Sequence, residues 1–504
     1  MSVEIEEKAV PSEPRLGDRL HPEPRLEPLV FERSGKGKVG YSLPPLDVPE
    51  VLLLPKTLLR EEIEGETEIS EVEVARHFTR LSRLNFGIDQ GLYPLGSCTM
   101  KHNPRTNEEV ARLPGFAASH PLAPEEVSQG ALELAWTLER VLCELTDLSR
   151  VTLQPAAGAQ GELAGILMVR AALEKSGNPR KTVLIPDSAH GTNPASAHFA
   201  GYKVKELKSN ARGTLDLHIL EEAMTEDVAA LMLTVPNTLG IFEDRILEIA
   251  RLVHAKGGYL YCDGANFNSF VGLAKPGRMG IDVMHMNLHK TFSTPHGGGG
   301  PGAGPVAVAE RLVPYLPRPT VERRSDGTFR LDFDRPDSIG RLRTFLGNYG
   351  MFVRALAYIA AYGNRIGEVA RGAVLNANYI RAGLAGVYHL KYDAPTMHEV
   401  VFSDKKQVEH GVHNMDIAKR LMDYGFHPPT ISFPLIVHGA LMIEPTETEG
   451  KAGLDAFIQA MRAIAKECEE SPEVVLNAPH TTPVKRVDEV GAARNLILRW
   501  RGLK

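Results

Sequence analysis

Short apolar runs alternate with segments of helical spacing through the middle of the chain, between residues 152 and 308. Four of these runs have the length of buried strands: 182–185, 228–235, 259–262 and 283–288. The clearest helical spacing lies between them, over 161–175 and 245–255. Strands and helices in alternation predict an α/β fold with a mainly parallel sheet that is covered on both faces. Ligands of such sheets bind at the carboxyl ends of the strands.

The segments on either side of this pattern predict an N-terminal arm, a second domain and a C-terminal tail. Residues 1–66 are rich in proline and poor in periodic apolar positions, which predicts an extended arm that lies over another surface. Helical spacing from Thr67 to Leu84 and a glycine-rich loop over 87–105 precede the sheet, so the large α/β domain is predicted over 67–340. We expect the remaining parts in this order: connecting helices over 341–388, a smaller α+β domain over 389–472 and a loosely packed tail over 473–504.

Composition narrows the kinds of protein that this chain can be. With 504 residues, of which 43% are hydrophobic and 24% charged, it has the balance of a large globular protein. The apolar runs are shorter than a membrane span and the N-terminal segment lacks a secretory pattern, so we expect a cytoplasmic location. Four scattered cysteines predict neither a disulfide framework nor a metal site. A net charge of -6 with mixed signs does not favour nucleic acid.

A lysine follows the last of the four predicted strands. Lys290 comes directly after His289 at the end of an apolar run, and the glycine-rich segment 296–302 comes next. A lysine at the carboxyl end of a strand lies where a cofactor would bind, and desolvation there favours the neutral amine that forms an imine. A surface lysine that enters a loop is the alternative interpretation.

An aspartate at the end of the neighbouring predicted strand supports the cofactor interpretation. Asp263 is followed by Ala265 and Asn266. A carboxylate at this position would keep the ring nitrogen of pyridoxal 5'-phosphate (PLP) protonated, so that the ring accepts electrons from the α-carbon of a substrate. The small Ala265 lets the ring lie flat, and Asn266 is placed to reach the 3' oxygen of the cofactor. An aspartate that caps the next helix is the alternative.

A glycine-rich turn offers a place for the phosphate of the same cofactor. Gly158, Ala159 and Gln160 come just before the predicted helix over 161–175. The free N–H groups and the positive end of a helix suit a phosphate group. Ordinary helix starts have similar sequences, and that alternative stays open for this motif alone.

Two further strand ends add polar groups. His190 follows the predicted strand over 182–185, where an imidazole can stack on a flat ring, and Thr192 comes two positions later. Thr234 and Asn237 come at the end of the strand over 228–235, and Asn237 is a second candidate for the 3' oxygen. A loop histidine with no contact to a ligand is the alternative for His190.

Five short motifs taken together resemble one known family: Gly158-Ala-Gln-Gly161, His190-Gly-Thr-Asn-Pro-Ala195, Pro236-Asn-Thr238, Asp263-Gly-Ala-Asn266 and Asn287-Leu-His-Lys290. The family is that of the glycine-cleavage-system decarboxylases, which belong to the fold-type I, aspartate-aminotransferase-like PLP enzymes. The likeness extends to residues 41–49, 93–104 and 444–448, and so covers nearly the whole chain.

The resemblance implies a fold-type I PLP-dependent transferase with a mainly parallel large-domain sheet and a smaller α+β C-terminal domain. It implies that PLP is held as a Schiff base on Lys290, and that Lys290, Asp263 and His190 are catalytic. Asn287 and His289 then join the cofactor-binding residues as contacts to the phosphate. The implied reaction releases the carboxyl group of glycine as CO2 and transfers the aminomethyl group to the lipoyl arm of the H-protein.

The resemblance also implies partners. In that family the decarboxylase is either one long polypeptide of two homologous halves or two separate subunits, and only the later half carries the lysine. A chain of 504 residues that has the lysine is similar to the second subunit of the split form. A homologous subunit that lacks the lysine, a two-plus-two heterotetramer and a lipoylated H-protein are therefore expected.

Two alternatives stay open on the sequence alone. The motif at Asp263 followed by His-Lys also suits a cysteine desulfurase or an aminotransferase, and a vestigial pocket would make the chain a structural or regulatory subunit. The loop over 93–104, with Lys101 inside it and Arg105 just beyond, is expected to line the entrance of the site. It would hold the carboxylate of the substrate or admit the lipoyl arm.

Overall fold

The computed structural model describes residues 26–49, 51, 54–60, 63, 66–297 and 300–498. Contacts divide the chain into two compact units. We call Ile88–Asn477 the main unit, and Met1–Gly87 together with Ala478–Lys504 the terminal unit. The predicted arm over 1–25 and the end of the tail over 499–504 lie outside the described residues. Within the described residues, every helix is too short or too polar to cross a membrane.

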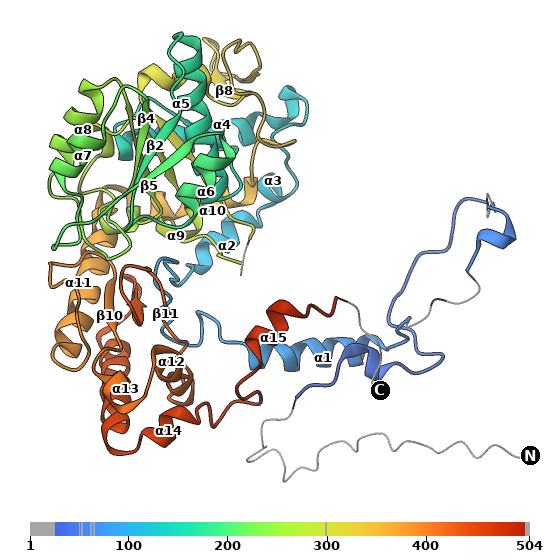
Figure 1. The fold of residues 1–504 in the computed structure, drawn as a ribbon. Helices are drawn as coiled ribbons and strands as arrows, with labels where there is room; N and C mark the ends of the chain where they lie inside the picture. The colour runs from blue at the N-terminus through green and yellow to red at the C-terminus, as the bar shows by residue number, and fades with distance from the viewer. Residues whose placement is uncertain are drawn as a thin grey trace, which may run out of the picture. The chain divides into compact units, whose positions relative to one another are not determined.

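A seven-stranded sheet forms the centre of the main unit (Figure 1). Its strands are β1 (Arg150–Thr152), β2 (Thr182–Pro186), β3 (Lys203–Leu207), β4 (Val228–Thr234), β5 (Tyr259–Gly264), β6 (Val283–Met286) and β7 (Val306–Val308). They lie in the order β1-β7-β6-β5-β4-β2-β3. The five strands from β6 to β3 are parallel, and β7 runs antiparallel to both β6 and β1. The predicted mainly parallel sheet is therefore confirmed.

Helices cover both faces of this sheet because successive side chains of a strand point to opposite sides. In β2, Leu184 packs with one face, whereas Val183 and Ile185 pack with the other. The first face is covered by α4 (Glu125–Thr146), α7 (Leu217–Ala223), α8 (Ile246–Ala255) and α10 (Tyr349–Tyr362). The second is covered by α5 (Gly158–Lys175) and α6 (Thr192–Phe199), which Figure 1 shows in front of the strands.

All four predicted strands are present, but the last one ends two residues earlier than predicted. The run over 283–288 ends as a strand at Met286, and a short helix, α9 (Leu288–Thr291), begins two residues later. Leu288 is completely buried, and a buried position is apolar in a strand and in a helix alike. The apolar run therefore does not show where the strand ends. Lys290 therefore lies on a helical turn beyond the strand.

Three strands of the large sheet and one hairpin were not predicted. The edge strand β3 has the sequence Lys-Val-Lys-Glu-Leu and is mostly exposed, so it lacks an apolar run. β1 and β7 have three residues each. The hairpin of β8 (Thr320–Arg323) and β9 (Phe329–Asp332) is likewise short. Such segments bury too few residues for a periodic pattern to identify them.

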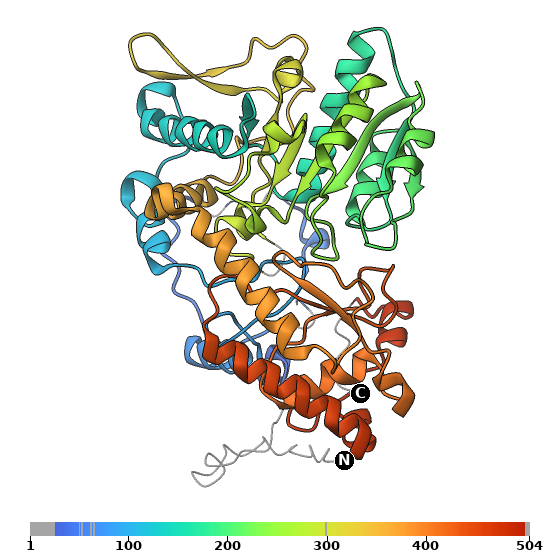
Figure 2. The ribbon, with the colours of Figure 1, turned by 90° about the vertical axis from the view of Figure 1, so that its left-hand side faces the viewer.

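A three-stranded antiparallel sheet forms the smaller part of the main unit. It consists of β10 (Val400–Ser403), β12 (Ala440–Ile443) and β11 (Thr430–Ile431), in that order. Four helices pack in this part: α11 (Gly367–Leu384), α12 (Asn414–Asp423), α13 (Lys451–Glu470) and α14 (Pro472–Leu476). Figure 2 shows α11 and α13 running side by side. The proposed domain boundaries at 340, 388 and 472 remain a proposal, because contacts group residues 88–477 as one unit.

The loop that precedes the large sheet is attached to the small one. Leu95 forms an antiparallel bridge with Ile443, and the Glu444 N–H donates to the Pro94 carbonyl. The approach is close: a Cβ added to Gly96 would lie 2.1 Å from Met442 Cγ. α2 (Arg105–Ala111) and α3 (Pro114–Ala117) follow this loop.

The terminal unit contains one long helix, α1 (Glu71–Leu84), and the short helix α15 (Glu489–Arg494). Ser70 caps α1 through a capping box with Glu73, which places the helix start four residues after the predicted Thr67. The described residues between 26 and 66 contain only two short 3-10 turns, η2 (Val30–Arg33) and η3 (Lys56–Leu58). Many apolar side chains of this segment are exposed, among them Leu29, Tyr41, Leu43, Leu46 and Val48.

Candidate active site

The carboxyl ends of the parallel strands bring the sequence-predicted residues together. Lys290 lies on α9, one turn beyond β6, and its side chain is buried. Its Nζ donates a 2.7 Å hydrogen bond to the carbonyl oxygen of Ser97, in the loop before α2. The lysine therefore faces the interior, and the surface-lysine alternative is wrong.

Asp263 lies on β5, next to β6 in the sheet. Its Oδ1 accepts the Ala265 N–H at 2.9 Å, and its Oδ2 accepts from Asn193 Nδ2 and Thr234 Oγ1 at 3.2 and 3.3 Å. Burial raises the pKa of Asp263, but the neighbouring His285 and His190, the Ala265 N–H and the Lys290 charge outweigh it and bring the pKa below its usual range. Asp263 is therefore a buried, ionised carboxylate, rather than a surface helix cap.

His285 is a part of this site that sequence reasoning missed. It lies within β6, and its Nε2 is 3.2 Å from Asp263 Oδ1. Its Nδ1 is 2.7 Å from the hydroxyl of Tyr261. Burial lowers the pKa of His285, so the ring is neutral at pH 7. His285 is in the middle of an apolar strand, so no sequence motif marks it. Its contact with Asp263 in the folded sheet identifies it as a residue of the site.

His190 is fixed by a chain of polar groups. Its Nδ1 lies 2.9 Å from Thr192 Oγ1, and the Thr192 hydroxyl lies 2.7 Å from Glu162 Oε1. Burial, followed by the charge of Asp263, raises the pKa of Glu162 to about 8. Glu162 was not predicted, because an acidic residue near the start of a helix is common for reasons of the helix dipole alone. Burial lowers the pKa of His190, which leaves a flat neutral ring.

The start of α5 forms a cradle of backbone groups. Gly158, Ala159 and Gln160 are its first three residues, whose N–H groups have no partner within the helix. A Cβ on Gly158 would lie 2.8 Å from Asn287 Nδ2, so the Asn287 side chain lies directly beside this turn. His289 Nε2 is 3.2 Å from the same Nδ2. These five residues converge as predicted, and they fit an anionic group.

The side chain of Gln160 differs from the others in this cradle. Its Oε1 accepts the Ala156 N–H at 2.7 Å and its Nε2 donates to the Leu342 carbonyl at 3.4 Å. The amide is thus committed to the protein. Only the backbone N–H of Gln160 is available to a ligand.

Of the two asparagines that were candidates for the 3' oxygen, Asn237 is committed to its own turn. Its Nδ2 donates to the Gly213 carbonyl at 2.7 Å, and its Oδ1 accepts the N–H groups of Leu239 and Ile241. Asn266 donates to the Pro236 carbonyl at 2.9 Å, but its buried Oδ1 has no partner among the described residues. The geometry therefore favours Asn266.

Buried polar atoms without partners cluster at these strand ends. Among the described residues they include Asn193 Oδ1, Asn266 Oδ1 and Asn287 Oδ1. An unpaired buried polar atom costs about 1–3 kcal/mol, so native chains seldom keep several in one place without a ligand. An amine, a carboxylate and an anion cradle at one sheet edge fit PLP.

Lys101 is not the free cation that the sequence suggested for the substrate carboxylate. Its Nζ donates to Glu447 Oε1 at 2.7 Å and to the Thr291 carbonyl at 2.8 Å. It also contacts Asn268 Oδ1 and the hydroxyl of Tyr358. All its donor capacity is used in joining the loop to α9 and α10. Arg105 is exposed and pairs with Asp89.

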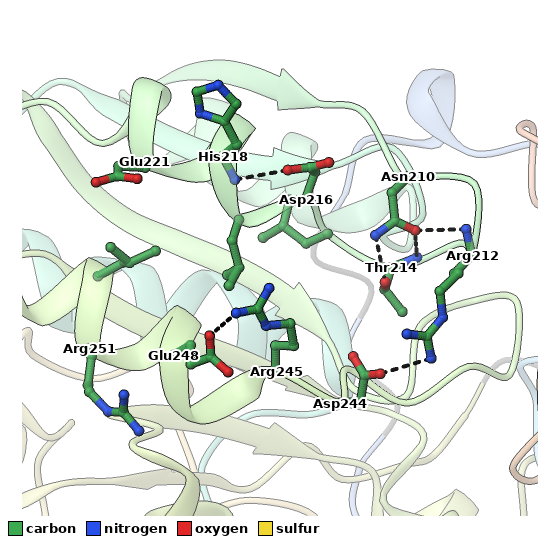
Figure 3. A pocket seen from close by; sticks show the side chains of 13 residues that line it. Asn210, Arg212, Thr214, Asp216, His218, Glu221, Asp244, Arg245, Glu248 and Arg251 are labelled. Carbon is green, nitrogen blue, oxygen red and sulfur yellow. Dashed lines mark hydrogen bonds and ion pairs between the residues drawn. The ribbon is translucent and has the colours of Figure 1, made fainter.

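A cavity of about 700 Å³ lies elsewhere, between the start of α7 and α8 (Figure 3). None of the sequence-predicted site residues lines it. Two of its arginines form ion pairs within the lining: Arg212 with Asp244, and Arg245 with Glu248. The candidate site is therefore identified by its convergent buried polar groups, and not by the presence of a cavity.

Family comparison agrees with this geometry. Residues 44–328 match the family described as "Glycine cleavage system P-protein", and residues 369–484 match "Glycine dehydrogenase, C-terminal domain". The "Probable glycine dehydrogenase (decarboxylating) subunit 2" of Caldanaerobacter subterraneus subsp. tengcongensis is 55% identical over 477 residues, or 94% of this chain and 98% of that protein. The protein of the same description from Bacillus licheniformis is also 55% identical over 477 residues, with the same coverage.

Solved structures show the fold. A crystal structure of glycine decarboxylase (P-protein) of the glycine cleavage system has a TM-score of 0.69 at 22% identity, covering 82% of this chain and 93% of that chain. The cysteine desulfurase CsdA of Escherichia coli has a TM-score of 0.57 at 18% identity, covering 75% of this chain and 95% of that chain. The predicted fold-type I architecture is confirmed.

The relatives decide between the alternatives that the sequence left open. Desulfurases share the fold at 18% identity, whereas the glycine dehydrogenase subunits share 55% of residues over almost the whole chain. The desulfurase and vestigial-subunit alternatives are therefore wrong. The chain belongs to the glycine cleavage system P-protein family, as a glycine dehydrogenase (decarboxylating) of the subunit 2 type.

Proposed function

We propose that this chain binds PLP covalently through Lys290, decarboxylates glycine and passes the aminomethyl group to the lipoyl arm of an H-protein. The observation that carries the proposal is the convergence of the Lys290 amine, the Asp263 carboxylate and the start of α5 at one edge of the sheet. In the transfer, the bond from glycine's α-carbon to its carboxyl group breaks, and CO2 leaves. The electron pair left behind forms a bond from the aminomethyl carbon to one sulfur of the lipoyl disulfide, the S–S bond breaks, and the other sulfur takes a proton.

The residues of this chain hold and tune the cofactor. When bound, PLP supplies an electron sink for the electron pair that the departing carboxyl group leaves behind. Asp263 would hold the proton on the pyridine nitrogen, with Thr234 and Asn193 orienting its Oδ2. His190, fixed by Thr192, offers its neutral ring for stacking.

The remaining contacts are assigned by position. The first N–H groups of α5 at Gly158, Ala159 and Gln160 would bind the phosphate, with Asn287 and His289 beside them. Asn266 would contact the 3' oxygen, and Ala265 leaves room for the ring. The burial of Lys290 excludes water from the nitrogen that exchanges with glycine's amine.

Partners are part of the proposal. Two relatives that are 55% identical to this chain are described as subunit 2, which supports a homologous partner subunit. We propose a lysine-lacking subunit and a two-plus-two assembly. The exposed apolar side chains of the terminal unit, such as Leu43, Leu46 and Val48, support a role of this unit in subunit contact.

Exchange of labelled CO2 into the carboxyl group of glycine tests the proposal. We expect exchange when the chain, its lysine-lacking partner and lipoylated H-protein are combined, and loss of exchange in Lys290→Ala. Lys256→Ala, which removes an exposed lysine after α8, is the matched control and should exchange normally. Wild-type exchange in Lys290→Ala would refute the assignment of Lys290.

A further inference from the structure

Two buried glutamates lie next to the loop that contacts Lys290. Glu399 comes directly before β10 and Glu444 directly after β12, and the side chains of both are fully buried. Single carboxylate oxygens of the two and a ring nitrogen of His398 all lie within 4.8 Å of one another. The proposed chemistry assigns no role to any of these three residues.

The two carboxyl groups accept hydrogen bonds from the two residues that flank Cys98 in this loop, Ser97 and Thr99. Glu399 Oε2 accepts the Ser97 N–H at 2.9 Å. Glu444 Oε2 accepts the Thr99 N–H at 2.9 Å, and Glu444 Oε1 accepts the Thr99 hydroxyl at 2.6 Å. The Ser97 carbonyl in turn accepts the Lys290 amine at 2.7 Å. A path of short contacts thus joins both carboxyl groups to Lys290.

This loop is held in a strained conformation. Ser97 has a φ of 63° and Thr99 a φ of 48°, in the left-handed region that side chains other than glycine seldom adopt. For a β-branched residue such as threonine the strain is greater. Such conformations persist only where the surroundings enforce them, and they concentrate at functional sites. The two glutamates provide that enforcement.

The hydrogen bonds distinguish the two carboxyl groups. Both oxygens of Glu444 accept hydrogen bonds from Thr99, which stabilises the ionised form. Glu399 Oε1 accepts none from any described residue, so that atom is the place for a proton. Two carboxylates at this separation, shielded from water, repel each other too strongly for both to be ionised.

The other titratable groups around the pair are consistent with one shared proton. Burial, and for Glu399 also the Glu444 charge, raises the pKa of both glutamates, while Lys290 acts in the opposite direction. Lys101 further favours an ionised Glu444. Burial lowers the pKa of His398 to about 3 and raises that of the Cys98 thiol, so both are neutral at pH 7.

Further titratable groups surround Lys290 itself. Burial lowers the pKa of each of the three histidines there, so they are uncharged at pH 7: His285, His289 and His296. Asp263 is the ionised group on the far side of the lysine, and Glu162 holds a proton up to a pKa of about 8. A negative charge on the glutamate pair therefore adds to the Asp263 charge at Lys290.

We propose that Glu399 and Glu444 share a single proton, Glu399 carrying it, and that their one remaining negative charge keeps the nitrogen of Lys290 protonated when it joins the cofactor. They are positioning residues, because they act through the loop of Ser97 to Thr99 and not on the reacting atoms. A protonated Schiff-base nitrogen makes the adjoining carbon the better target for glycine's amine. This inference rests on the proposed covalent role of Lys290.

The test is a pH titration of the absorption band of the bound cofactor, whose colour reports the proton on the Lys290 nitrogen. The proteins compared are the wild type, Glu399→Gln, Glu444→Gln and the double variant. Glu399→Gln removes a neutral group, so its midpoint should not move. In Glu444→Gln, Glu399 loses its charged neighbour and ionises, so the midpoint should move only in part. The double variant has no charge left, and its midpoint should fall by about one unit or more.

A matched control and a second variant distinguish a loss of charge from misfolding of the variants. Glu243→Gln changes another buried carboxyl that accepts a backbone N–H, that of Leu215, and should leave the midpoint unmoved. Thr99→Val keeps the β-branched shape but removes one donor to Glu444, so its midpoint should fall in the same direction as in the double variant, by less.

Three results would overturn the shared proton. A fall in Glu399→Gln equal to that in Glu444→Gln would mean that both groups are ionised, and an unmoved midpoint in the double variant would mean that both are neutral. A stoichiometric metal ion in the wild type that the double variant lacks would mean that the cluster binds a cation. Absence of the absorption band in the wild type would refute the Lys290 proposal itself, and so is distinguishable from failure of the pair.

Discussion

Lys290 Nζ donates a 2.7 Å hydrogen bond to the carbonyl of Ser97, 193 positions earlier in the chain. Lys290 follows β6 of the large sheet, whereas the loop of Ser97 adds to the small sheet through the bridge of Leu95 and Ile443. The position of the amine therefore depends on both sheets. Reacting groups that are fixed from two sides lose less entropy when they reach the reactive geometry.

Replacement of Asp263 by Asn tests the assignment of the ring-nitrogen partner. We expect cofactor binding to persist in part, and decarboxylation to slow by orders of magnitude, since each ~1.4 kcal/mol of lost transition-state stabilisation is about tenfold in rate. CO2 exchange per bound cofactor is the measurement. Asp282→Asn, at a buried aspartate that pairs with Arg311 and His254, should lower stability but leave the rate per bound cofactor normal.

Gly158→Ala tests the phosphate cradle. The new Cβ would lie 2.8 Å from Asn287 Nδ2 and 3.2 Å from His285 Nε2, so the Asn287 amide must move from the start of α5. We expect the dissociation constant of PLP to rise about tenfold or more, corresponding to ~1.4 kcal/mol. Gly130→Ala within α4 meets nothing within 4 Å and should bind PLP normally. Equal affinities of the two variants would contradict the placement of the phosphate.

Lys101→Met tests the interpretation of Lys101 as a structural cation. Its loss leaves the Glu447 carboxylate buried without its cation, and such broken pairs cost about 3–5 kcal/mol. We expect a clear fall in the melting temperature. Arg105→Ala breaks the exposed pair with Asp89 and should cost about 0.5 kcal/mol. A Lys101→Met protein as stable as Arg105→Ala would show that the buried pair contributes little.

Glu243 predicts a pH dependence of stability that is independent of the active site. Burial raises its pKa from 4.5 to about 7, so the folded chain keeps a proton that the unfolded chain releases near pH 4.5. The unfolding free energy therefore falls between pH 4.5 and 7, by a contribution on the order of 3 kcal/mol from this group. Melting temperatures of wild type and Glu243→Gln should diverge across this range, with the smaller fall in the variant. Parallel curves would contradict the buried proton.

Motifs at the ends of parallel strands could be predicted from the sequence because the fold brings those ends to one edge. Asp263 and Lys290 follow neighbouring strands, so two local patterns and the parallel sheet were enough to place them together. The same reasoning placed Gly158, His190 and Thr234. It failed to separate Asn237, which follows β4, from Asn266, which follows β5, because hydrogen bonds that no pattern encodes decide which amide keeps an unpaired atom.

Residues that depend on packing between the two sheets could not be predicted. Thr99 and Glu444 are 345 positions apart, and their contact exists only because the loop before α2 pairs with the end of β12. Lys101 looked like a ligand-binding cation because a sequence does not record burial. Conversely, His285 lies within an apolar strand and Glu162 near the start of a helix. Neither residue type nor position in the sequence marked these two as site residues.

Reduction followed by peptide mapping tests the proposed covalent bond between Lys290 and PLP most directly. The PLP-loaded protein is treated with borohydride and digested, and the peptides are analysed by mass spectrometry. We expect one modified residue, Lys290, in stoichiometric amount, and no modification in Lys290→Ala. Modification of Lys101 or of another lysine instead, or an unmodified Lys290 in a protein that retains its cofactor, would contradict it.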